Sequence, residues 1–392
     1  SAPERWEFDS PGVRRVVAAD GSGPGPRRFT ALVVVYADAA GAVQEMLDDL
    51  RGDLGEERGV VEVGVEHGAE NTTFKEHFGF SADGLSQPIV QGIRSEDSEP
   101  NAWVVRTGEF VLGYLNELGH YPPSPGVAAE HDPRAVLPTF PDDGLPGFGD
   151  FGRNGTYLVY RKLHQDVAGF WRHVHDSVPR APTGSRESAM AALAAKYLGR
   201  WPSGAPLVLA PDADDSTLGD RNDFMYRPID PDGLACPVGA HIRRANPRDG
   251  FRRIADTAEE SIRNSNQHRI LRRGISYGDP LFAKEEVERG HAPIDLVDDG
   301  RPRGLHFLAV NSDIQRQFEF VQETWLNNGN FNGLVDNRDP LVGDNDGSGT
   351  MTIQRRPVRR RVRDVPRFVH VRGGAYLFLP SITALRFLGG EG

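Results

Sequence analysis

The sequence has almost no cysteine. Cys236 is the only one among 392 residues, so the chain cannot form an internal disulfide. A single thiol also excludes the zinc sites that are built from pairs of cysteines. Low cysteine usage is typical of a reducing compartment, and we therefore predict a cytoplasmic protein. A chain from which a leader had already been removed would have the same composition.

Long apolar runs and an excess of positive charge are also missing. No stretch approaches the roughly 20 apolar residues that cross a bilayer. The 45 basic and 56 acidic side chains leave a net charge of −11. An acidic surface disfavours nucleic acids and anionic membranes, so we expect neither as a partner. The glycine motifs of nucleotide sites and the HExxH zinc motif are absent, which argues against those chemistries.

The apolar residues that are present, 38% of the chain, are enough for a sizeable core. A β-branched run at 29–37 predicts a buried strand, and residues 39–54 follow with helical spacing. The same order of strand and helix recurs at 156–163 and 167–178, where Asp166 is placed to cap the helix. The chain therefore contains at least two units that begin in the same way.

Further elements complete this pattern. Strands are predicted within 102–114, 304–312 and 374–379, and helices at 188–201, 314–328 and 381–388. Residues 122–152 are rich in proline, glycine and aspartate, which is typical of a linker. We predict an α+β fold with mainly antiparallel sheets and domains at 1–150 and 151–392.

His241 lies in the motif CPVGAHIRRANPRD (236–249), after a proline–glycine turn. A neutral imidazole is a common ligand of haem iron, and the arginines beside it would suit the haem propionates. No CxxCH motif occurs, so such a haem would not be covalently attached. The alternatives are a structural histidine, a solvated basic helix face and a haem thiolate ligand at Cys236.

An acid and a cation in two other segments would suit peroxide chemistry. Asp83, in EHFGFSADGLSQP (76–88), lies between small residues that leave room for a small oxidant. Its carboxylate could move a proton between the two peroxide oxygens, although Asp-Gly is also a common turn pair. Arg272, in HRILRRGISYG (268–278), could stabilise the negative charge that develops, and Arg273 is its neighbour and rival.

Two more positions could support a haem. Asp339, in NRDPLVG (337–343), is the predicted acceptor for the imidazole N–H, and Asp336 is its rival. Leu305 and Phe307 alternate with His306 along a predicted strand, so one face of that strand could line the haem pocket. Ordinary turn formation and core packing are the alternatives.

These motifs, taken in order, resemble the dye-decolorizing peroxidase family. The similarity extends over roughly residues 76–390 and includes GEFVLGYLNELG, FGRNGTYLVYRKLHQDVAGFW, LGRWPSGAPL, NDF, GLHFLAVNSDIQRQFEFVQ and VRGGAYLFLPS. The long second half is most similar to the larger, C/D-type branch. GFSADG has one residue more between its glycine and Asp83 than the family's GxxDG motif.

The resemblance implies a pair of ferredoxin-like domains, with haem b bound mostly by the second. It implies His241 as the iron ligand, Asp83 and Arg272 as catalytic residues, and Asp339 as the acid behind the histidine. Positions around the haem are then Gly84, Leu85, Leu305 and Phe307.

The implied activity is a peroxidase that uses hydrogen peroxide to oxidise bulky aromatic substrates, such as dyes and phenols, through a ferryl intermediate. The alternative is a protein that binds or delivers haem without peroxidase turnover. The sequence identifies neither the reductant nor the oligomeric state.

Overall fold

The structure is a computed structural model of the chain. It describes residues 8–9, 27–55, 58–68, 75–81, 87–92, 104–178, 185–281, 293 and 296–390. Asp83, Gly84 and Leu85 lie outside these ranges. Statements below about what is absent refer to the described residues only.

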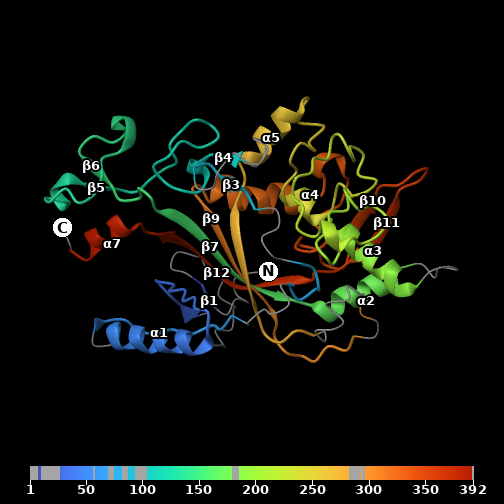
Figure 1. Ribbon diagram of the computed structural model, residues 1–392, viewed down its shortest axis with the longest axis horizontal. Helices are drawn as coiled ribbons and strands as arrows, with labels where there is room; N and C mark the ends of the chain where they lie inside the picture. The colour runs from blue at the N-terminus through green and yellow to red at the C-terminus, as the bar shows by residue number, and fades with distance from the viewer. Residues whose placement is uncertain are drawn as a thin grey trace, which may run out of the picture.

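A six-stranded sheet forms the centre of the molecule (Figure 1). Its strand order is β2-β1-β12-β7-β9-β8, and the four strands from β12 to β8 pair antiparallel. The strands are β1 (Phe8–Asp9), β2 (Arg27–Arg28), β7 (Thr156–Gln165), β8 (Leu271–Tyr277), β9 (Gly304–Asn311) and β12 (Val369–Leu379). The predicted strands at 156–163, 304–312 and 374–379 are therefore confirmed.

The four antiparallel strands have the connectivity of a ferredoxin-like unit. When the strands β7, β8, β9 and β12 are numbered 1 to 4 in chain order, they lie in the sheet as 4-1-3-2. Helical segments connect the first strand to the second and the third to the fourth. This is the split βαβ arrangement, in which β9 separates the two strands β7 and β8 that run in the same direction.

Two helices follow β7 and begin where the sequence predicts. In α2 (Val167–Ser177), the Asp166 side chain accepts a hydrogen bond from the amide of Gly169 at 2.8 Å. In α3 (Arg186–Leu198), the helix ends at Gly199, whose φ of 100° only glycine adopts readily. The helix therefore stops before the predicted position at Pro202. Both helices contribute to the largest hydrophobic cluster, which includes Phe170, Trp171 and Tyr197.

The helix predicted at 314–328 has a wider hydrogen-bond spacing than an α-helix. Its segments η9 (Gln315–Glu319) and η10 (Val321–Leu326) are both π-helical. Trp325 is buried here with Phe251 and Phe331. Further helices are α4 (His241–Ala245), α5 (Ala258–Asn266) and α7 (Ile382–Leu388), and α4 packs against η10.

Short strand pairs surround the central sheet. They are β3 (Ile89–Val90) with β4 (Val104–Val105), β5 (Gly126–Ala128) with β6 (Phe148–Asp150), and β10 (Gly349–Ile353) with β11 (Arg360–Val365). The pair β5–β6 lies inside the predicted linker at 122–152. That segment is an ordered hairpin, because its strands satisfy each other's backbone groups and it buries Leu137 and Asp150.

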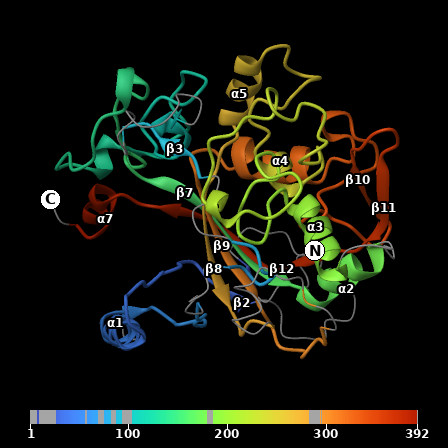
Figure 2. The same ribbon diagram turned by 45° about the vertical axis from the view of Figure 1, so that its right-hand side comes forward.

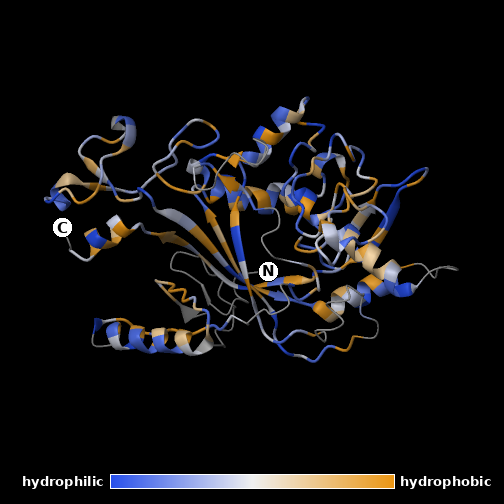
Figure 3. Cartoon of the chain, in the orientation of Figure 1, coloured by the Kyte–Doolittle hydropathy of each residue, from blue (hydrophilic) through white to orange (hydrophobic). Residues whose placement is uncertain are grey.

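In the N-terminal part of the chain, the structure agrees with the predictions from the sequence only at the helix. The helix α1 (Ala40–Asp53) matches the prediction at 39–54. The buried strand predicted at 29–37 is wrong, because no ladder is assigned there and Val33 is 58% exposed. β-branched residues favour a strand only when a neighbouring strand pairs with them, and none is described here. Figures 2 and 3 show this apolar segment between β2, at the edge of the central sheet, and α1.

The sheet topology confirms an α+β fold with mainly antiparallel pairing. The division into domains at 1–150 and 151–392 stays a proposal. In the described parts of the chain, no helix is both long enough and apolar enough to cross a membrane.

We expect Asp166→Ala to lower the free energy of unfolding by about 1 kcal/mol, because the first turn of α2 loses its side-chain cap. Chemical denaturation followed by circular dichroism measures this. Asp166→Ser keeps a capping oxygen and should retain most of the stability. Equal losses in the two variants would contradict a capping role.

Candidate active site

The first part of the site is a histidine paired with a buried carboxylate. Nδ1 of His241, the first residue of α4, lies 3.0 Å from Oδ2 of Asp339. Asp339 is fully buried, whereas 27% of the His241 side chain is exposed. When Nδ1 carries the proton of this hydrogen bond, the lone pair of Nε2 is available to a ligand.

The carboxylate of Asp339 is fixed from both sides. Its Oδ1 accepts hydrogen bonds from the amides of Leu341 and Val342, both at 2.9 Å. Burial raises the pKa of Asp339, but the charge and hydrogen bond of His241 and the amide of Val342 outweigh it, and the net pKa is lowered. An ionised carboxylate therefore stands behind the imidazole. Its rival Asp336 is exposed and has a positive φ of 55°, as expected for a turn residue.

The two arginines after His241 have structural partners. Arg243 donates to the carboxylate of Asp230 at 3.2 Å and to the carbonyl of Cys236 at 2.8 Å. Arg244 donates to the carbonyls of Trp325, Asn328 and Asn337. Both are almost fully buried. The predicted role for them beside haem propionates is therefore wrong, and so is the alternative of a solvated helix face, because their donors hold the protein's own loops.

Cys236 lies in the segment that precedes α4, and it is buried. Burial raises the pKa of its thiol to about 11, although Arg243 opposes this shift. Its backbone N–H donates to the carboxylate of Asp230 at 2.8 Å, which helps to hold the loop that leads to His241. The thiol is therefore protonated near neutral pH, which argues against Cys236 as a thiolate ligand.

The second part of the site is on β8, at the edge of the central sheet. Arg272 is opposite Ala309, Gly274 is opposite Phe307 and Ser276 is opposite Leu305. Residues opposite each other in an antiparallel pair point to the same face, and the face alternates along each strand. Arg272, Leu305 and Phe307 therefore share one face of the sheet.

Arg272 and Arg273 differ in environment because they point to opposite faces. The side chain of Arg272 is half-buried, and its loss of solvation lowers its pKa, whereas Arg273 is exposed. On the face of Arg272, the other β8 positions are Gly274 and Ser276. Among the described residues, a Cβ at Gly274 would meet only Leu305, at 3.9 Å, so these residues leave space on this face.

Three buried arginines accompany Arg272. Burial, together with repulsion from neighbouring arginines, lowers the pKa of Arg200 to about 10 and that of Arg269 to about 9. Burial lowers the pKa of Arg248 to about 10. Arg248 stacks on Phe224 at 3.9 Å. We call Arg200, Arg248, Arg269 and Arg272 the arginine group. Its members come from the segment after α3, the His241 motif and the strand β8, so it connects both parts of the site.

Sequence reasoning missed Arg200 and Arg269. The motifs LGRWPSG and HRILRR contain them, but arginine is usually a surface residue, and no spacing rule distinguishes a buried one.

Asp83, Gly84 and Leu85 belong to residues 82–86, which the structure does not describe. The residues on either side of this loop are anchored. Before the loop, the amide of Ser81 donates to the carbonyl of Pro202 at 3.1 Å. The Glu76 carboxylate accepts from the amides of Phe78 and Phe80 and lies close enough to His241 for their charges to interact. The loop that contains Asp83 therefore starts near His241.

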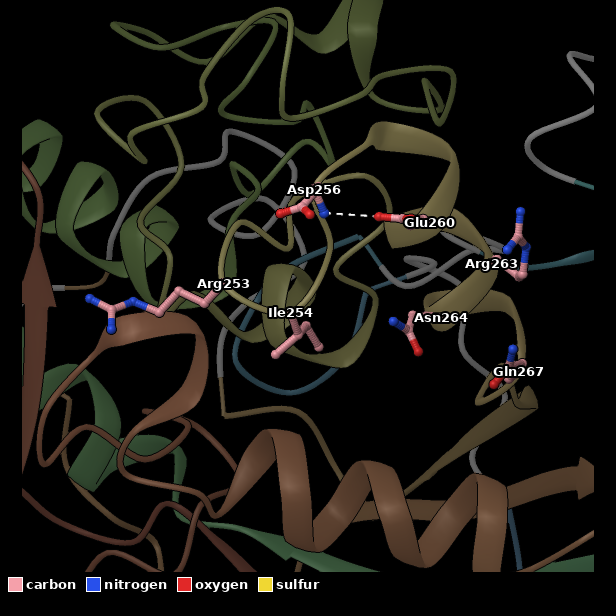
Figure 4. A pocket seen from close by; sticks show the side chains of 7 residues that line it. All are labelled: Arg253, Ile254, Asp256, Glu260, Arg263, Asn264 and Gln267. Atoms are coloured by element: carbon pink, nitrogen blue, oxygen red, sulfur yellow. Dashed lines mark hydrogen bonds between the residues drawn. The ribbon is translucent and has the colours of Figure 1, made fainter.

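A cavity of about 540 Å³ lies elsewhere, along α5 (Figure 4). It is lined by Arg253, Ile254, Asp256, Glu260, Arg263, Asn264 and Gln267. Glu260 accepts a hydrogen bond there from the amide of Asp256, at 2.9 Å. None of the predicted site residues lines this polar cavity, so it does not bear on their chemistry.

Protein ligands alone do not form a metal site in the described ranges. No group of three or more histidine, cysteine, aspartate or glutamate side chains converges there on a point that could hold an ion. A metal at His241 would therefore need ligands from a cofactor.

Comparison with known proteins identifies the family. No family model matches the chain. A dye-decolorizing peroxidase of Exidia glandulosa is 32% identical over 83% of this chain and 57% of its own length. Over most of its length, the chain is homologous to curated dye-decolorizing peroxidases. The chain spans about 56 to 61% of the length of the curated members that it matches.

Solved structures of the family support the fold. An ancestral D-type dye decolorizing peroxidase has a TM-score of 0.66 and 28% identity, over 89% of this chain and 71% of that one. A dye-decolorizing peroxidase in complex with 2,6-dimethoxyphenol has a TM-score of 0.66 and 27% identity, with the same coverage. The family's α+β, ferredoxin-like fold is thus confirmed, and the D-type relative agrees with the larger branch predicted from sequence.

We expect Cys236 to resist alkylation in the folded protein at pH 8, because its thiol is buried and has a pKa of about 11. Mass spectrometry after iodoacetamide treatment measures this. The denatured chain is the control and should react completely. Rapid modification of the native thiol would reopen Cys236 as a reactive or metal-binding residue.

Proposed function

We propose that this chain binds haem b through His241 and acts as a peroxidase on aromatic substrates. The observation that carries the proposal is the pair formed by Nδ1 of His241 and the buried Asp339 carboxylate. A carboxylate hydrogen-bonded to a ligating histidine fixes its ring orientation and raises its basicity, which suits a metal ligand.

The other described residues fit a haem. Its propionates carry two negative charges, and the arginine group supplies buried cations whose mutual repulsion an anion would relieve. The face of β8 and β9 beside Arg272 has small side chains at Gly274 and Ser276, next to Leu305 and Phe307. We assign the apolar wall of the haem pocket to Leu305 and Phe307, and carry Gly84 and Leu85 as the family's further contacts.

When bound, the haem would supply an iron centre that accepts the oxidising equivalents of hydrogen peroxide. The chain's own residues move the proton and stabilise charge. Asp83 would take a proton from one peroxide oxygen and deliver it to the other, which then leaves as water. Arg272, whose half-buried side chain has lost part of its solvation, would stabilise the negative charge on the separating oxygens.

Two anchors support placing Asp83 near Arg272. Ser81 is held to Pro202, and Gln87 is held to the backbone of Arg272 itself. Asp83 precedes Gln87 by four positions, and a chain of that length spans at most about 14 Å. Asp83 therefore lies within that reach of a residue that is fixed at the strand bearing Arg272.

The proposed substrates are hydrogen peroxide and an aromatic reductant. The relative that was solved with 2,6-dimethoxyphenol supports a methoxylated phenol as a test substrate. The second candidate is haem binding or delivery without turnover. The presence of Arg272 argues against this candidate, because a haem carrier needs no cation on this face of the sheet. The cytoplasmic location stays a prediction.

We expect His241→Ala to lose most of its bound haem and its Soret absorption, because the proposed iron ligand is removed. Absorption spectra of protein purified with excess haem measure this. Cys236→Ser should keep wild-type haem content. Normal haem content and an unchanged spectrum in the His241 variant would contradict the assignment.

We expect Arg272→Leu and Asp83→Asn to bind haem but to react slowly with peroxide. Loss of an electrostatic donor costs about 10²–10³-fold and loss of an acid–base group about 10²–10⁴-fold. Stopped-flow spectroscopy at varied peroxide concentration gives these rates. Arg273→Leu is the matched control, because that exposed side chain points to the opposite face. Wild-type rates in both site variants would remove Asp83 and Arg272 from the mechanism.

A further inference from the structure

Gln87 makes two hydrogen bonds to the backbone of one residue, Arg272. Its Nε2 donates to the carbonyl of Arg272 at 2.7 Å, and its Oε1 accepts from the amide of Arg272 at 3.3 Å. A side-chain amide thus pairs with a strand as a peptide of a neighbouring strand would. We call these two bonds the Gln87 bracket.

The position of Arg272 in the sheet explains why the bracket matters. Among the described strands, β8 is the last in the sheet and pairs only with β9. In an antiparallel pair, every second residue directs its N–H and C=O away from the partner strand. At the edge of a sheet these groups have no ladder partner. The Gln87 bracket satisfies both groups at Arg272, the residue whose half-buried side chain lies on the face with Gly274 and Ser276.

Apolar packing holds Gln87 in place. The strand β3 begins two residues later, and its Val90 is buried in a small cluster with Val105 and Phe110. Leu271 and Val310, which are opposite each other in β8 and β9, pack against this cluster. The segment with Gln87 is thus docked beside Arg272 by contacts that do not involve the bracket itself.

We propose that Gln87 is a positioning residue for peroxide cleavage, an inference that rests on the proposed function. The bracket fixes the backbone of Arg272 and hence the direction in which its side chain leaves the strand. Peroxide cleavage needs the guanidinium of Arg272 at a defined position, so the bracket acts through Arg272.

The test compares Gln87→Ala with Thr107→Val in the haem-loaded full chain. Thr107 makes one bond from its hydroxyl to the carbonyl of Gln91, in the same segment, without touching Arg272. We expect the second-order rate with peroxide to fall about 10- to 100-fold in Gln87→Ala, since small misplacements of reacting groups have effects of this size. Thr107→Val should stay within about twofold of wild type, and the rate of reductant oxidation should be unchanged in both.

Gln87→Glu gives a second readout that a purely structural role would not move. At neutral pH its carboxylate faces the carbonyl of Arg272 and cannot donate, so the peroxide rate should fall as in Gln87→Ala. A protonated carboxyl regains the donor, so the ratio of variant to wild-type rate should rise toward one as pH falls below about 4. In Gln87→Ala that ratio should not change with pH.

Hydrogen exchange at the amide of Arg272 separates the possible failures. It should become at least about tenfold faster in Gln87→Ala and stay unchanged in Thr107→Val, because only the former frees that N–H. Faster exchange with a wild-type peroxide rate would overturn the positioning role. Unchanged exchange would overturn the bracket itself. A wild-type peroxide rate in Arg272→Leu would instead reject the role of Arg272 in the proposed function, on which this inference rests.

Discussion

Buried guanidinium groups are the constraint on which the rest of this structure depends. Arg200, Arg243 and Arg244 are among its largest fully buried side chains. An ion removed from water must recover its solvation from fixed partners. Arg243 and Arg244 recover it from Asp230 and from backbone carbonyls, so the loops around α4 are shaped by the need to present those oxygens. The position of His241 is a consequence of this arrangement.

The arginine group is balanced differently. Arg200, Arg248 and Arg269 repel one another or Arg272, and burial lowers the pKa of each. Phe224 offers its ring to both Arg200 and Arg248, at 5.6 and 3.9 Å. Such contacts lower the cost of burying the cations without removing their repulsion. A dianionic cofactor at this point would lower the cost of burying the cations and would also relieve their repulsion. The charges of the arginine group would then act on the same cofactor as His241.

The sequence predicted the elements whose residues follow one regular pattern. The strand β7 is rich in β-branched and aromatic residues, β9 is rich in apolar residues, and α2 and α7 carry their capping residues, Asp166 and Ser381. These successes share a cause, since each depends on local chemistry that a short stretch of sequence contains. The pair of His241 and Asp339 is different: the order of motifs along the chain predicted it, and the structure brings the two residues together.

The failures depend on partners far away in the chain. Residues 29–37 have the composition of a strand, but a strand needs a neighbour, and composition does not supply one. The sequence predicts a linker where the structure has the hairpin β5–β6, because the proline and glycine residues there do not indicate that two strands pair. The π-helical spacing of η9 and η10 has no sequence rule comparable to the 3.6-residue period.

The strand β8 shows why the part of the site around Arg272 is the hardest to predict from the sequence. One face bears Leu271, Ile275 and Tyr277 together with the exposed Arg273, and the other bears only Arg272, Gly274 and Ser276. A search for alternating apolar residues finds no clear strand there. The features that defeat such a search are those that a cofactor pocket needs: open space from small residues, and one cation that is partly shielded from solvent.

Because that face of β8 lacks the side chains that usually fix a strand's register, the register must be held from elsewhere. Pairing with β9, the packing of Leu271 against Val90 and Val105, and the bracket from Gln87 do so. A slip of one residue would bury Arg273 and expose Arg272, so these contacts decide which arginine faces the pocket.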